Sequence, residues 1–414
     1  MRILWVVNTI FPSLSLSLGL QPPMSGSWMY GLAEKISEQN DIKLTVVTVY
    51  NGKEILEKRI DGIDYILIPM KNKKMWGSVF DHVKPQLVHI HGSEFSYGLD
   101  LMEQRPEGKY ILSIQGLVSV CADYYLAGLS IKDVIKNITL RDLLKNDNLF
   151  QARNKFKKRG VVEKKYFSKV DAILGRTDWD RAHAWALNQN VPYYHCDEML
   201  RKEFYTDEKW SYENCEKNSI FISAANYPLK GFHQVLKAAN LVKKTCPDLR
   251  IYVAGHKVCG DGTLKSELKL SGYGLYIKKL IRKYKLDQNV IFLGVLTAEQ
   301  MKERYLKSHI FICPSSIENS PNSIAEAQIL GVPVIASYVG GVTSTISHKK
   351  TGFLYEYNDY TILANYISQI LLNKINITIL SECERNIAKE RHNKDIIVEQ
   401  LRGCYILKVG GGGC

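Results

Sequence analysis

Short apolar runs rich in β-branched residues alternate with amphipathic stretches along almost the whole chain. In the first half, the runs predicted to form strands are 3–7, 44–49, 65–69, 87–91, 110–114 and 172–174, and a helix is expected over 28–39. In the second half, strands are predicted at 219–223, 250–254, 290–293, 309–313 and 332–336, with helices at 232–244, 273–284 and 322–330. Strands that alternate with helices are typical of right-handed βαβ crossovers. The pattern therefore predicts an α/β protein with parallel sheets.

A polar stretch separates the two series of strands. Residues 205–218 are rich in Asp, Glu, Lys and Asn, and we interpret them as a linker between a domain at 1–204 and a domain at 219–385. Residues 386–414 are expected to form a C-terminal helix and a glycine-rich tail. A chain of 414 residues is too long for one ordinary core, which supports two domains.

The first residues could imitate a signal peptide, because Arg2 precedes the apolar run 3–7. That run ends at Asn8, and no small-residue cleavage site follows it through Pro23. A first strand explains the run better, and no stretch of about 18 apolar residues is present to span a bilayer. We therefore expect a cytoplasmic location, with peripheral docking on the inner membrane face as an open alternative.

The net charge of +13 favours anionic partners, namely nucleic acid, a phospholipid surface or phosphorylated substrates. The basic clusters at 155–159 and 278–283 have helical spacing, so solvated helix faces explain each of them better than a binding site does. The nine cysteines show no metal or redox spacing and are expected to be reduced thiols.

The segment after the predicted strand 309–313 carries the most specific chemistry. Ser320 is a suitable N-cap for the helix that follows, and Pro321 suits its first position. The first amides of that helix would then be free at the positive end of its dipole, where they suit a phosphate. These amides belong to Asn322, Ser323 and Ile324.

Two glutamates flank this helix start, Glu318 in the loop and Glu326 inside the helix. A carboxylate can accept paired hydrogen bonds from vicinal hydroxyls, so one of them can hold a ribose and the other a sugar. Taken alone, an ordinary loop residue and an ordinary helix residue would explain the pair equally well.

The residues after Glu326 extend the pattern. They are Ala327-Gln328-Ile329-Leu330-Gly331-Val332-Pro333-Val334-Ile335-Ala336, followed by Gly340-Gly341 and Thr351-Gly352-Phe353-Leu354. The whole segment resembles the signature of the family 4 retaining glycosyltransferases of the GT-B fold, also called glycosyl transferases group 1. The resemblance implies two Rossmann-like domains facing a cleft, with the C-terminal helix crossing back to the N-terminal domain. It also implies that Glu318 contacts the donor sugar and Glu326 the ribose.

A second match lies after the predicted strand 219–223, where Lys230 precedes Gly231. A lysine at the top of a parallel strand can neutralise a diphosphate leaving group, and the family places a lysine there. The family also has an arginine five residues earlier, where this chain has Ala225. Leaving-group stabilisation is therefore expected to rest on Lys230 and the helix that begins near Asn322.

The first half resembles the family's acceptor domain more loosely. Gly26 precedes the first helix, where the family has a glycine-rich loop between acceptor and donor. His91 ends the strand 87–91 and is a candidate to line the cleft, whereas His89 is expected to be structural. Where the family commonly has a histidine after strand 110–114, this chain has Gln115, whose amide can hold a sugar hydroxyl but cannot transfer a proton. In the family the leaving phosphate accepts the acceptor proton, so a missing base is compatible with catalysis.

Further candidates follow the strand 172–174. Arg176 begins a stretch that predicts either a cleft element or a helix capped by Thr177 or Asp178. Glu198, near the expected linker, is a weaker candidate.

The predicted function is transfer of a hexose or N-acetylhexosamine from a nucleotide-diphosphate sugar to a glycan or lipid-linked acceptor in cell-surface polysaccharide synthesis. We favour a UDP-sugar over a GDP-sugar and expect neither a metal nor a cofactor, because lysine and helix dipoles can carry the phosphate charge. A sugar-nucleotide epimerase and a catalytically silent nucleotide-binding partner remain alternatives. Nucleic-acid binding would explain the positive net charge but not the two glutamates. Docking on an anionic membrane surface is also compatible with the positive charge.

Overall fold

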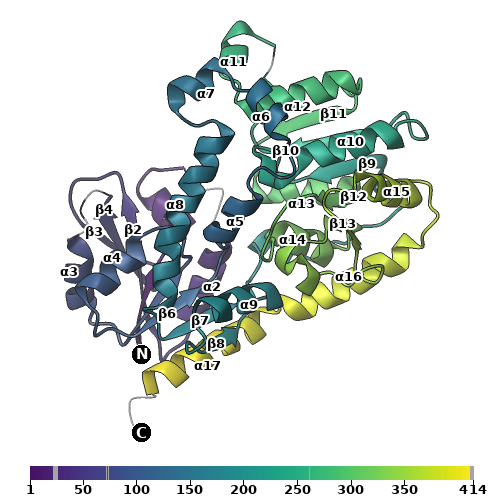
Figure 1. Ribbon diagram of the computed structural model, residues 1–414. Helices are drawn as coiled ribbons and strands as arrows, with labels where there is room; N and C mark the ends of the chain where they lie inside the picture. The colour runs from purple at the N-terminus through teal and green to yellow at the C-terminus, as the bar shows by residue number, and fades with distance from the viewer. Residues whose placement is uncertain (22–26, 71, 73, 261, 411–414) are drawn as a thin grey trace. The chain divides into compact units, whose positions relative to one another are not determined.

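The computed structural model describes residues 1–21, 27–70, 72, 74–260 and 262–410 (Figure 1). The chain forms two compact units. Unit 1 combines residues 1–119, 158–202 and the C-terminal residues from 391 onward, and unit 2 combines 120–157 with 203–390. Unit 2 therefore includes a segment from the first half of the sequence, which our sequence-based division assigned to the first domain.

Unit 1 is built on an eight-stranded sheet in the order β3-β4-β2-β1-β5-β6-β7-β8. The strands are β1 (Arg2–Val6), β2 (Lys43–Tyr50), β3 (Leu56–Ile60), β4 (Ile63–Pro69), β5 (Leu87–His91), β6 (Tyr110–Ser113), β7 (Ala172–Gly175) and β8 (Tyr193–His195). All neighbours pair in parallel except β3, which forms an antiparallel hairpin with β4 at the sheet edge. The central strands are apolar and buried, as in sheets covered on both faces.

The helices of unit 1 are α1 (Pro12–Ser17), α2 (Ser27–Ser37), α3 (Met75–Val83), α4 (Tyr97–Gln104), α9 (Asp178–Leu187) and α17 (Lys394–Gly410). The C-terminal helix α17 packs into the core of this unit. The Trp5 indole donates to the Tyr405 hydroxyl at 2.8 Å, and this hydroxyl also lies 2.7 Å from His89 Nδ1. The predicted return of the C-terminal helix to the N-terminal domain is confirmed.

Unit 2 contains a six-stranded sheet in the order β11-β10-β9-β12-β13-β14, and every pair in it is parallel. Its strands are β9 (Glu216–Ile222), β10 (Arg250–Ala254), β11 (Val290–Gly294), β12 (Ser308–Cys313), β13 (Val334–Ser337) and β14 (Phe353–Tyr355). Its helices are α10 (Phe232–Val242), α11 (Leu264–Leu268), α12 (Gly272–Lys283), α13 (Ala298–Lys307), α14 (Asn322–Leu330), α15 (Tyr360–Leu371) and α16 (Ile377–Arg391). The predicted architecture of two parallel-sheet α/β domains is confirmed.

The segment between β6 and β7 is helical. It contains α5 (Val118–Tyr124), α6 (Ile131–Lys136), α7 (Leu140–Lys145) and the first half of α8 (Leu149–Phe167). It packs on the helices of unit 2 through buried polar contacts. His233 Nε2 on α10 lies 2.9 Å from the carbonyl oxygen of Ala127, and the Tyr357 hydroxyl donates to the same carbonyl at 2.9 Å. These bonds explain why 120–157 belongs to unit 2.

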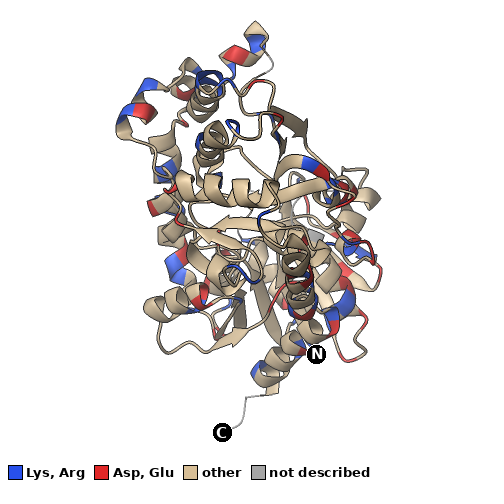
Figure 2. Cartoon of the chain, turned by 90° about the vertical axis from the view of Figure 1, so that its right-hand side faces the viewer, with Lys and Arg blue, Asp and Glu red and all other residues tan. Residues whose placement is uncertain are grey.

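Basic residues are spread over helices and loops of the chain (Figure 2). The clusters 155–159 and 278–283 lie on α8 and α12, as their helical spacing predicted. Some of their members make structural contacts. Arg159 donates to the Glu94 carbonyl at 3.1 Å, and Lys279 donates to Asn137 at 2.8 Å.

Candidate functional site

The order of each sheet places a topological switch point beside its first strand. In unit 2 the chain runs from β9 to β10 and β11, then returns to the other side of β9 as β12. Ligands of open α/β sheets bind at the carboxyl ends of the strands at such a point. Lys230 follows β9 and Glu318 follows β12, so the sequence-predicted donor residues lie at the switch point of unit 2.

Glu318 and Lys230 are in direct contact. Lys230 Nζ lies 2.6 Å from Glu318 Oε1, and the Ser315 hydroxyl donates to the same oxygen at 2.7 Å. The Lys230 side chain remains 27% exposed and the Glu318 side chain 17% exposed, so a ligand in solvent can reach both. Burial by itself would lower the pKa of Lys230, but the neighbouring Glu318 carboxylate raises it above its ordinary value. Lys230 is therefore a permanent cation.

Two glycines fix the backbone around this ion pair. Gly231 has φ +66°, and a Cβ there would lie 1.7 Å from the Pro314 carbonyl oxygen. Gly340 has φ +50°, and its Cβ would lie 2.1 Å from the carbonyl oxygen of Glu318. The same carbonyl accepts a hydrogen bond from the Gly341 amide at 3.0 Å. The glycines therefore allow the loops that carry Lys230 and Glu318 to approach closely.

The start of α14 differs in detail from its prediction. Pro321, not Ser320, is the N-cap, and no side chain caps the helix. The reason is that Pro321 has ψ 118°, an extended value that excludes it from the helix. The Ile324 amide is not free as predicted, because it donates to the Pro321 carbonyl at 2.9 Å. The amides of Asn322 and Ser323 have no acceptor among the described residues, so they are available to an anion.

Glu326 and Ala225 lie in the interior of unit 2. Glu326 is on α14 and only 4% exposed. Ala225, which stands where the family has an arginine, is buried as well. Among the described residues, the groups at this site that can balance the charge of a leaving diphosphate are therefore the Lys230 cation and the amides of Asn322 and Ser323.

The candidates of unit 1 lie at the carboxyl ends of neighbouring strands. His91 ends β5 and pairs in register with Ser113 of β6, which Gln115 follows closely. Gln115 Nε2 donates to Glu198 Oε1 at 3.3 Å. Arg176 forms an ion pair with Glu198 and donates to the Gln115 carbonyl at 3.0 Å. Gln115 is therefore held on two sides by a buried ion pair.

His91 is buried among aromatic rings, with centroid distances of 4.3 Å to Trp5 and 3.9 Å to His89. Its ring nitrogens have no hydrogen-bond partner among the described residues, and burial lowers its pKa to about 3. His91 is thus neutral at physiological pH, which suits a hydrogen-bonding group better than a proton donor. His89 bonds to Tyr405 and, at 2.7 Å, to Ser113, and so has the structural role expected of it.

Other predictions in unit 1 have mixed outcomes. Thr177 caps α9 through a reciprocal capping box with Asp180, so the cap predicted at Thr177 or Asp178 is confirmed at Thr177. Arg176 is buried with Glu198 just before that cap. Gly26 lies outside the described residues.

Sequence reasoning missed Glu94. Its Oε2 atom is buried and has no hydrogen-bond partner among the residues that the structure describes, and a Cβ on Gly92 would stand 2.1 Å from it. Burial, with a smaller contribution from Glu163, raises the pKa of Glu94 to about 7. An acid three residues beyond the end of β5 at His91, just after Gly92, was the available signal.

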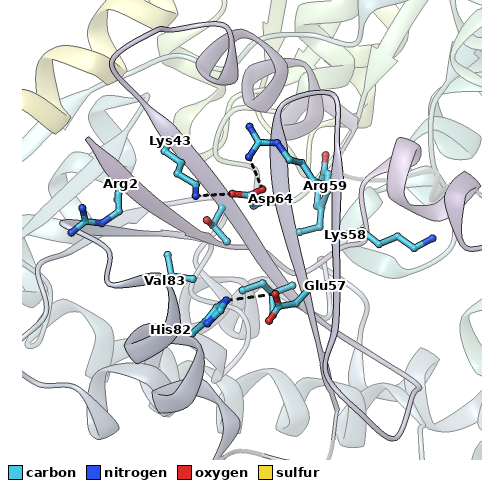
Figure 3. Close-up of a pocket in the computed structure, with 11 residues that line it drawn as sticks. Arg2, Lys43, Glu57, Lys58, Arg59, Asp64, His82 and Val83 are labelled. Carbon is cyan, nitrogen blue, oxygen red and sulfur yellow. Dashed lines mark hydrogen bonds and ion pairs between the residues drawn. The ribbon is translucent and has the colours of Figure 1, made fainter.

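A cavity of about 350 Å³ lies elsewhere in unit 1 (Figure 3). It lies beside the amino ends of β1 and β2, where Arg2 and Lys43 begin the strands. Asp64 lies 3.4 Å from Lys43 and 3.3 Å from Arg59, so the positive charges that line the cavity are partly compensated. The cavity contains no predicted site residue. The described residues also contain no cluster of three or more His, Cys, Asp or Glu suited to a metal ion.

Part of the chain matches a known protein family and several known proteins in sequence. Residues 205–391 match the family described as "Glycosyl transferases group 1". N-acetyl-alpha-D-glucosaminyl L-malate synthase of Bacillus anthracis is 26% identical over 48% of this chain and 48% of its own length. UDP-Gal:alpha-D-GlcNAc-diphosphoundecaprenol alpha-1,3-galactosyltransferase of Escherichia coli is 28% identical over 36% of each chain. These alignments span about half or less of the relatives' lengths.

Two of the similar solved structures share the fold over at least 98% of this chain. Sucrose-phosphate synthase from Thermosynechococcus elongatus superposes with a TM-score of 0.70 at 17% identity, covering 100% of both chains. The Anabaena protein HepE, solved with UDP-glucose, has a TM-score of 0.69 at 12% identity and covers 98% of this chain and 99% of its own. At these identities the likeness shows the GT-B fold alone. Residues 205–391, which carry Lys230, Glu318 and Glu326, thus match the glycosyl transferases group 1 family that the sequence motifs resemble.

Proposed function

We propose that this protein is a retaining glycosyltransferase that moves a hexose or N-acetylhexosamine from a nucleotide-diphosphate sugar to a glycan or lipid-linked acceptor. The observation that carries the proposal is the Lys230–Glu318 contact at the switch point between β9 and β12. A permanent cation and a carboxylate at this position suit a ligand that joins a diphosphate to a sugar.

The donor chemistry follows from these groups. Lys230 and the open amides of Asn322 and Ser323 would balance the charge that develops on the diphosphate as the sugar leaves. Glu318 would accept hydrogen bonds from the donor-sugar hydroxyls, and Glu326 from the ribose hydroxyls. HepE was solved with UDP-glucose, and the Escherichia coli relative is named for UDP-Gal, which supports a UDP-sugar donor.

In a single-step route to retention, the acceptor oxygen attacks the face from which the diphosphate leaves. In the proposed step the bond from the anomeric carbon to the phosphate oxygen breaks, and a bond to the acceptor oxygen forms on the same side. The departing phosphate oxygen takes the acceptor's proton, so no side-chain base is needed. His91, neutral and buried, and Gln115, held by Glu198 and Arg176, would supply hydrogen bonds to sugar hydroxyls.

Two relatives support a role in cell-surface polysaccharide synthesis. The Escherichia coli relative is named for a diphosphoundecaprenol-linked acceptor, and a relative in Staphylococcus aureus is named as a capsular polysaccharide biosynthesis glycosyltransferase. None of the helices in the described part of the chain is both long enough and apolar enough to cross a bilayer. With the net charge of +13, we propose a cytoplasmic enzyme that docks peripherally on the anionic inner face of the membrane.

A donor screen tests the proposal. The protein would be incubated with UDP- and GDP-linked hexoses and N-acetylhexosamines, and release of nucleoside diphosphate would be measured. We expect one donor class to be turned over, with the anomeric configuration kept in the product by NMR. An inverted product would contradict retention. An epimerised donor without transfer would favour the epimerase, and binding of nucleotide without sugar release would favour the silent partner.

A further inference from the structure

Three short helices of unit 2 expose an unusual number of large aliphatic side chains. The members of this set are between 56% and 85% exposed. They are Ile131 and Ile135 on α6, Leu140, Leu143 and Leu144 on α7, and Leu264 and Leu268 on α11. We call them the aliphatic surface. Contiguous exposed apolar groups mark interaction sites, whereas single ones need no explanation.

The aliphatic surface is held in place by the rest of unit 2. The Thr139 hydroxyl donates to the Leu270 carbonyl at 2.8 Å, which joins the start of α7 to the residues just after α11. Asp142 on α7 accepts the Gly272 amide of α12 at 2.8 Å. A Cβ on Gly272 would lie 2.7 Å from the Asp142 carboxylate, so the two segments are in close contact. The three helices therefore lie together, as they do in Figure 1.

Helices α6 and α7 expose more aliphatic side chains than they bury. On α6, Val134 is buried and faces the protein, while Ile131 and Ile135 are exposed. On α7, Asp142 is buried and Leu143 and Leu144 are exposed. On α7 the polar Asp142 therefore points inward and the two leucines point to solvent. This outward face of α7 is suited to an apolar environment.

Exposed lysines are interleaved with the aliphatic residues. They are Lys132 and Lys136 on α6, Lys145 on α7, and Lys265 and Lys269 on or next to α11. Two of the nearby acids are already paired, since Asp142 is bound by Arg141 at 3.0 Å and Glu267 forms an ion pair with Lys278. At the top of Figure 2, blue and red residues alternate on the helices. The surface therefore combines aliphatic side chains with a net positive charge.

The combination of exposed aliphatic side chains and lysines distinguishes between a protein partner and a lipid bilayer. Lysine is depleted in protein–protein interfaces, so a second copy or another protein is a poor match. At a bilayer, leucine and isoleucine enter the acyl boundary while flexible lysines reach up to anionic headgroups. We propose that the aliphatic surface formed by α6, α7 and α11 docks on an anionic phospholipid bilayer. The inference rests on the membrane docking proposed above and assigns it to one defined surface.

Vesicle co-sedimentation of the full chain tests this assignment. Wild-type protein is expected to bind vesicles of phosphatidylcholine with phosphatidylglycerol at low salt, and to bind pure phosphatidylcholine vesicles at least about tenfold more weakly. The double variant Leu143→Gln/Leu144→Gln should lower binding to the anionic vesicles about tenfold or more. The variant Lys132→Glu/Lys136→Glu should do the same and weaken the salt dependence. All these residues are exposed, so folding should be unaffected.

Ile379→Gln is the matched control, because Ile379 is 59% exposed on α16 of the same unit but outside the aliphatic surface. It is expected to bind vesicles like the wild type. The assignment is overturned if Ile379→Gln weakens binding as much as the leucine variant, or if the leucine variant binds like the wild type. A change from dimer to monomer in sedimentation velocity on Leu143→Gln/Leu144→Gln would instead identify a self-interface and also overturn it.

A second readout separates this inference from the proposed enzymatic function. Nucleoside diphosphate release from a UDP-sugar with a water-soluble acceptor should be unchanged in the leucine variant. Lys230→Ala should lose turnover and still bind vesicles. Failure of turnover in the wild type would count against the proposed function alone, whereas failure of vesicle binding would count against the docking surface alone.

Discussion

Lys230 Nζ lies 2.6 Å from Glu318 Oε1, although 88 residues separate them in the chain. The contact exists because β9 and β12 are neighbours in the sheet and both loops leave its carboxyl edge. A cation placed there by the topology is available to every diphosphate that enters the site. The contact therefore links the fold of unit 2 to its proposed chemistry.

Replacing Lys230 should affect turnover far more than stability. We expect Lys230→Ala to lower kcat by about 10²–10³, because the cation stabilises charge that develops on the leaving diphosphate. Steady-state kinetics with the donor found by the screen would measure this effect. Lys244→Ala removes the same charge from an exposed position after α10 and serves as control. Equal effects of the two substitutions would show that Lys230 acts only through the overall charge.

The glycines beside the ion pair should not tolerate a side chain. Gly340→Ala would press a Cβ against the Glu318 carbonyl, and Gly231→Ala against the Pro314 carbonyl. We expect each to lower the free energy of unfolding by about 1–3 kcal/mol and to weaken nucleotide binding. Gly403→Ala is the control, since nothing lies within 4 Å of its Cβ in α17 and alanine should add about 0.5–1 kcal/mol there. Urea unfolding of the three variants measures the difference, and a Gly340→Ala protein as stable as the wild type would refute the close approach.

The buried ion pair of unit 1 predicts strong coupling. Arg176 and Glu198 have side chains only 5% and 9% exposed, and removing one partner leaves the other charge unpaired. Arg176→Met should therefore cost about 3–5 kcal/mol of unfolding free energy. The double variant Arg176→Met/Glu198→Gln should recover part of that loss, because neither buried charge then remains. Urea unfolding of Arg176→Met, Glu198→Gln and the double variant measures this coupling. A loss of unfolding free energy in the double variant equal to the sum of the two single losses would contradict the pairing.

His233 should make unit 2 sensitive to acid. Burial lowers the pKa of His233 to about 3, from an ordinary value of 6.5. Below pH 6.5 the unfolded chain takes up a proton that the folded chain refuses, so stability falls as pH falls toward about 3. The slope from this one group is at most about 1.4 kcal/mol per pH unit.

His233→Gln tests that slope. It should cost about 1–3 kcal/mol at pH 7.5 through the lost bond to the Ala127 carbonyl. Between pH 6.5 and 4, however, its unfolding free energy should fall less steeply than that of the wild type. Urea unfolding at four pH values would measure both effects. Parallel stability curves would mean that His233 accepts a proton in the folded protein.

The sequence predicted the regular parts of both sheets, because their strands are apolar, β-branched and separated by helices. It missed β3, whose residues Glu57, Lys58 and Arg59 give a polar edge strand without the apolar signal of a central one. It assigned Thr139 and Asp142 to the first domain, since their contacts with Leu270 and Gly272 are tertiary and leave no local pattern.

The candidate site shows the same division between local and tertiary information. The motif at Glu318 and Lys230 was sufficient to predict that they share a site, because their positions follow from strand ends. The helix start was misplaced by one residue, since sequence does not reveal the extended ψ of Pro321. The pairing of Arg176 with Glu198 was also out of reach, because both had only weak local signals and their contact depends on how the chain packs.

The most direct test of the central claim is calorimetric titration of UDP into wild-type protein, Asn322→Pro and Asn322→Ala. Proline at the first helical position is well tolerated, and the extended ψ of Pro321 suits it, so Asn322→Pro removes one open amide without disturbing α14. Asn322→Ala keeps that amide and serves as control. We predict one-site binding by the wild type and Asn322→Ala, and binding about tenfold weaker by Asn322→Pro. Absence of UDP binding to the wild type, or equal affinity of all three proteins, would contradict a nucleotide diphosphate site at the start of α14.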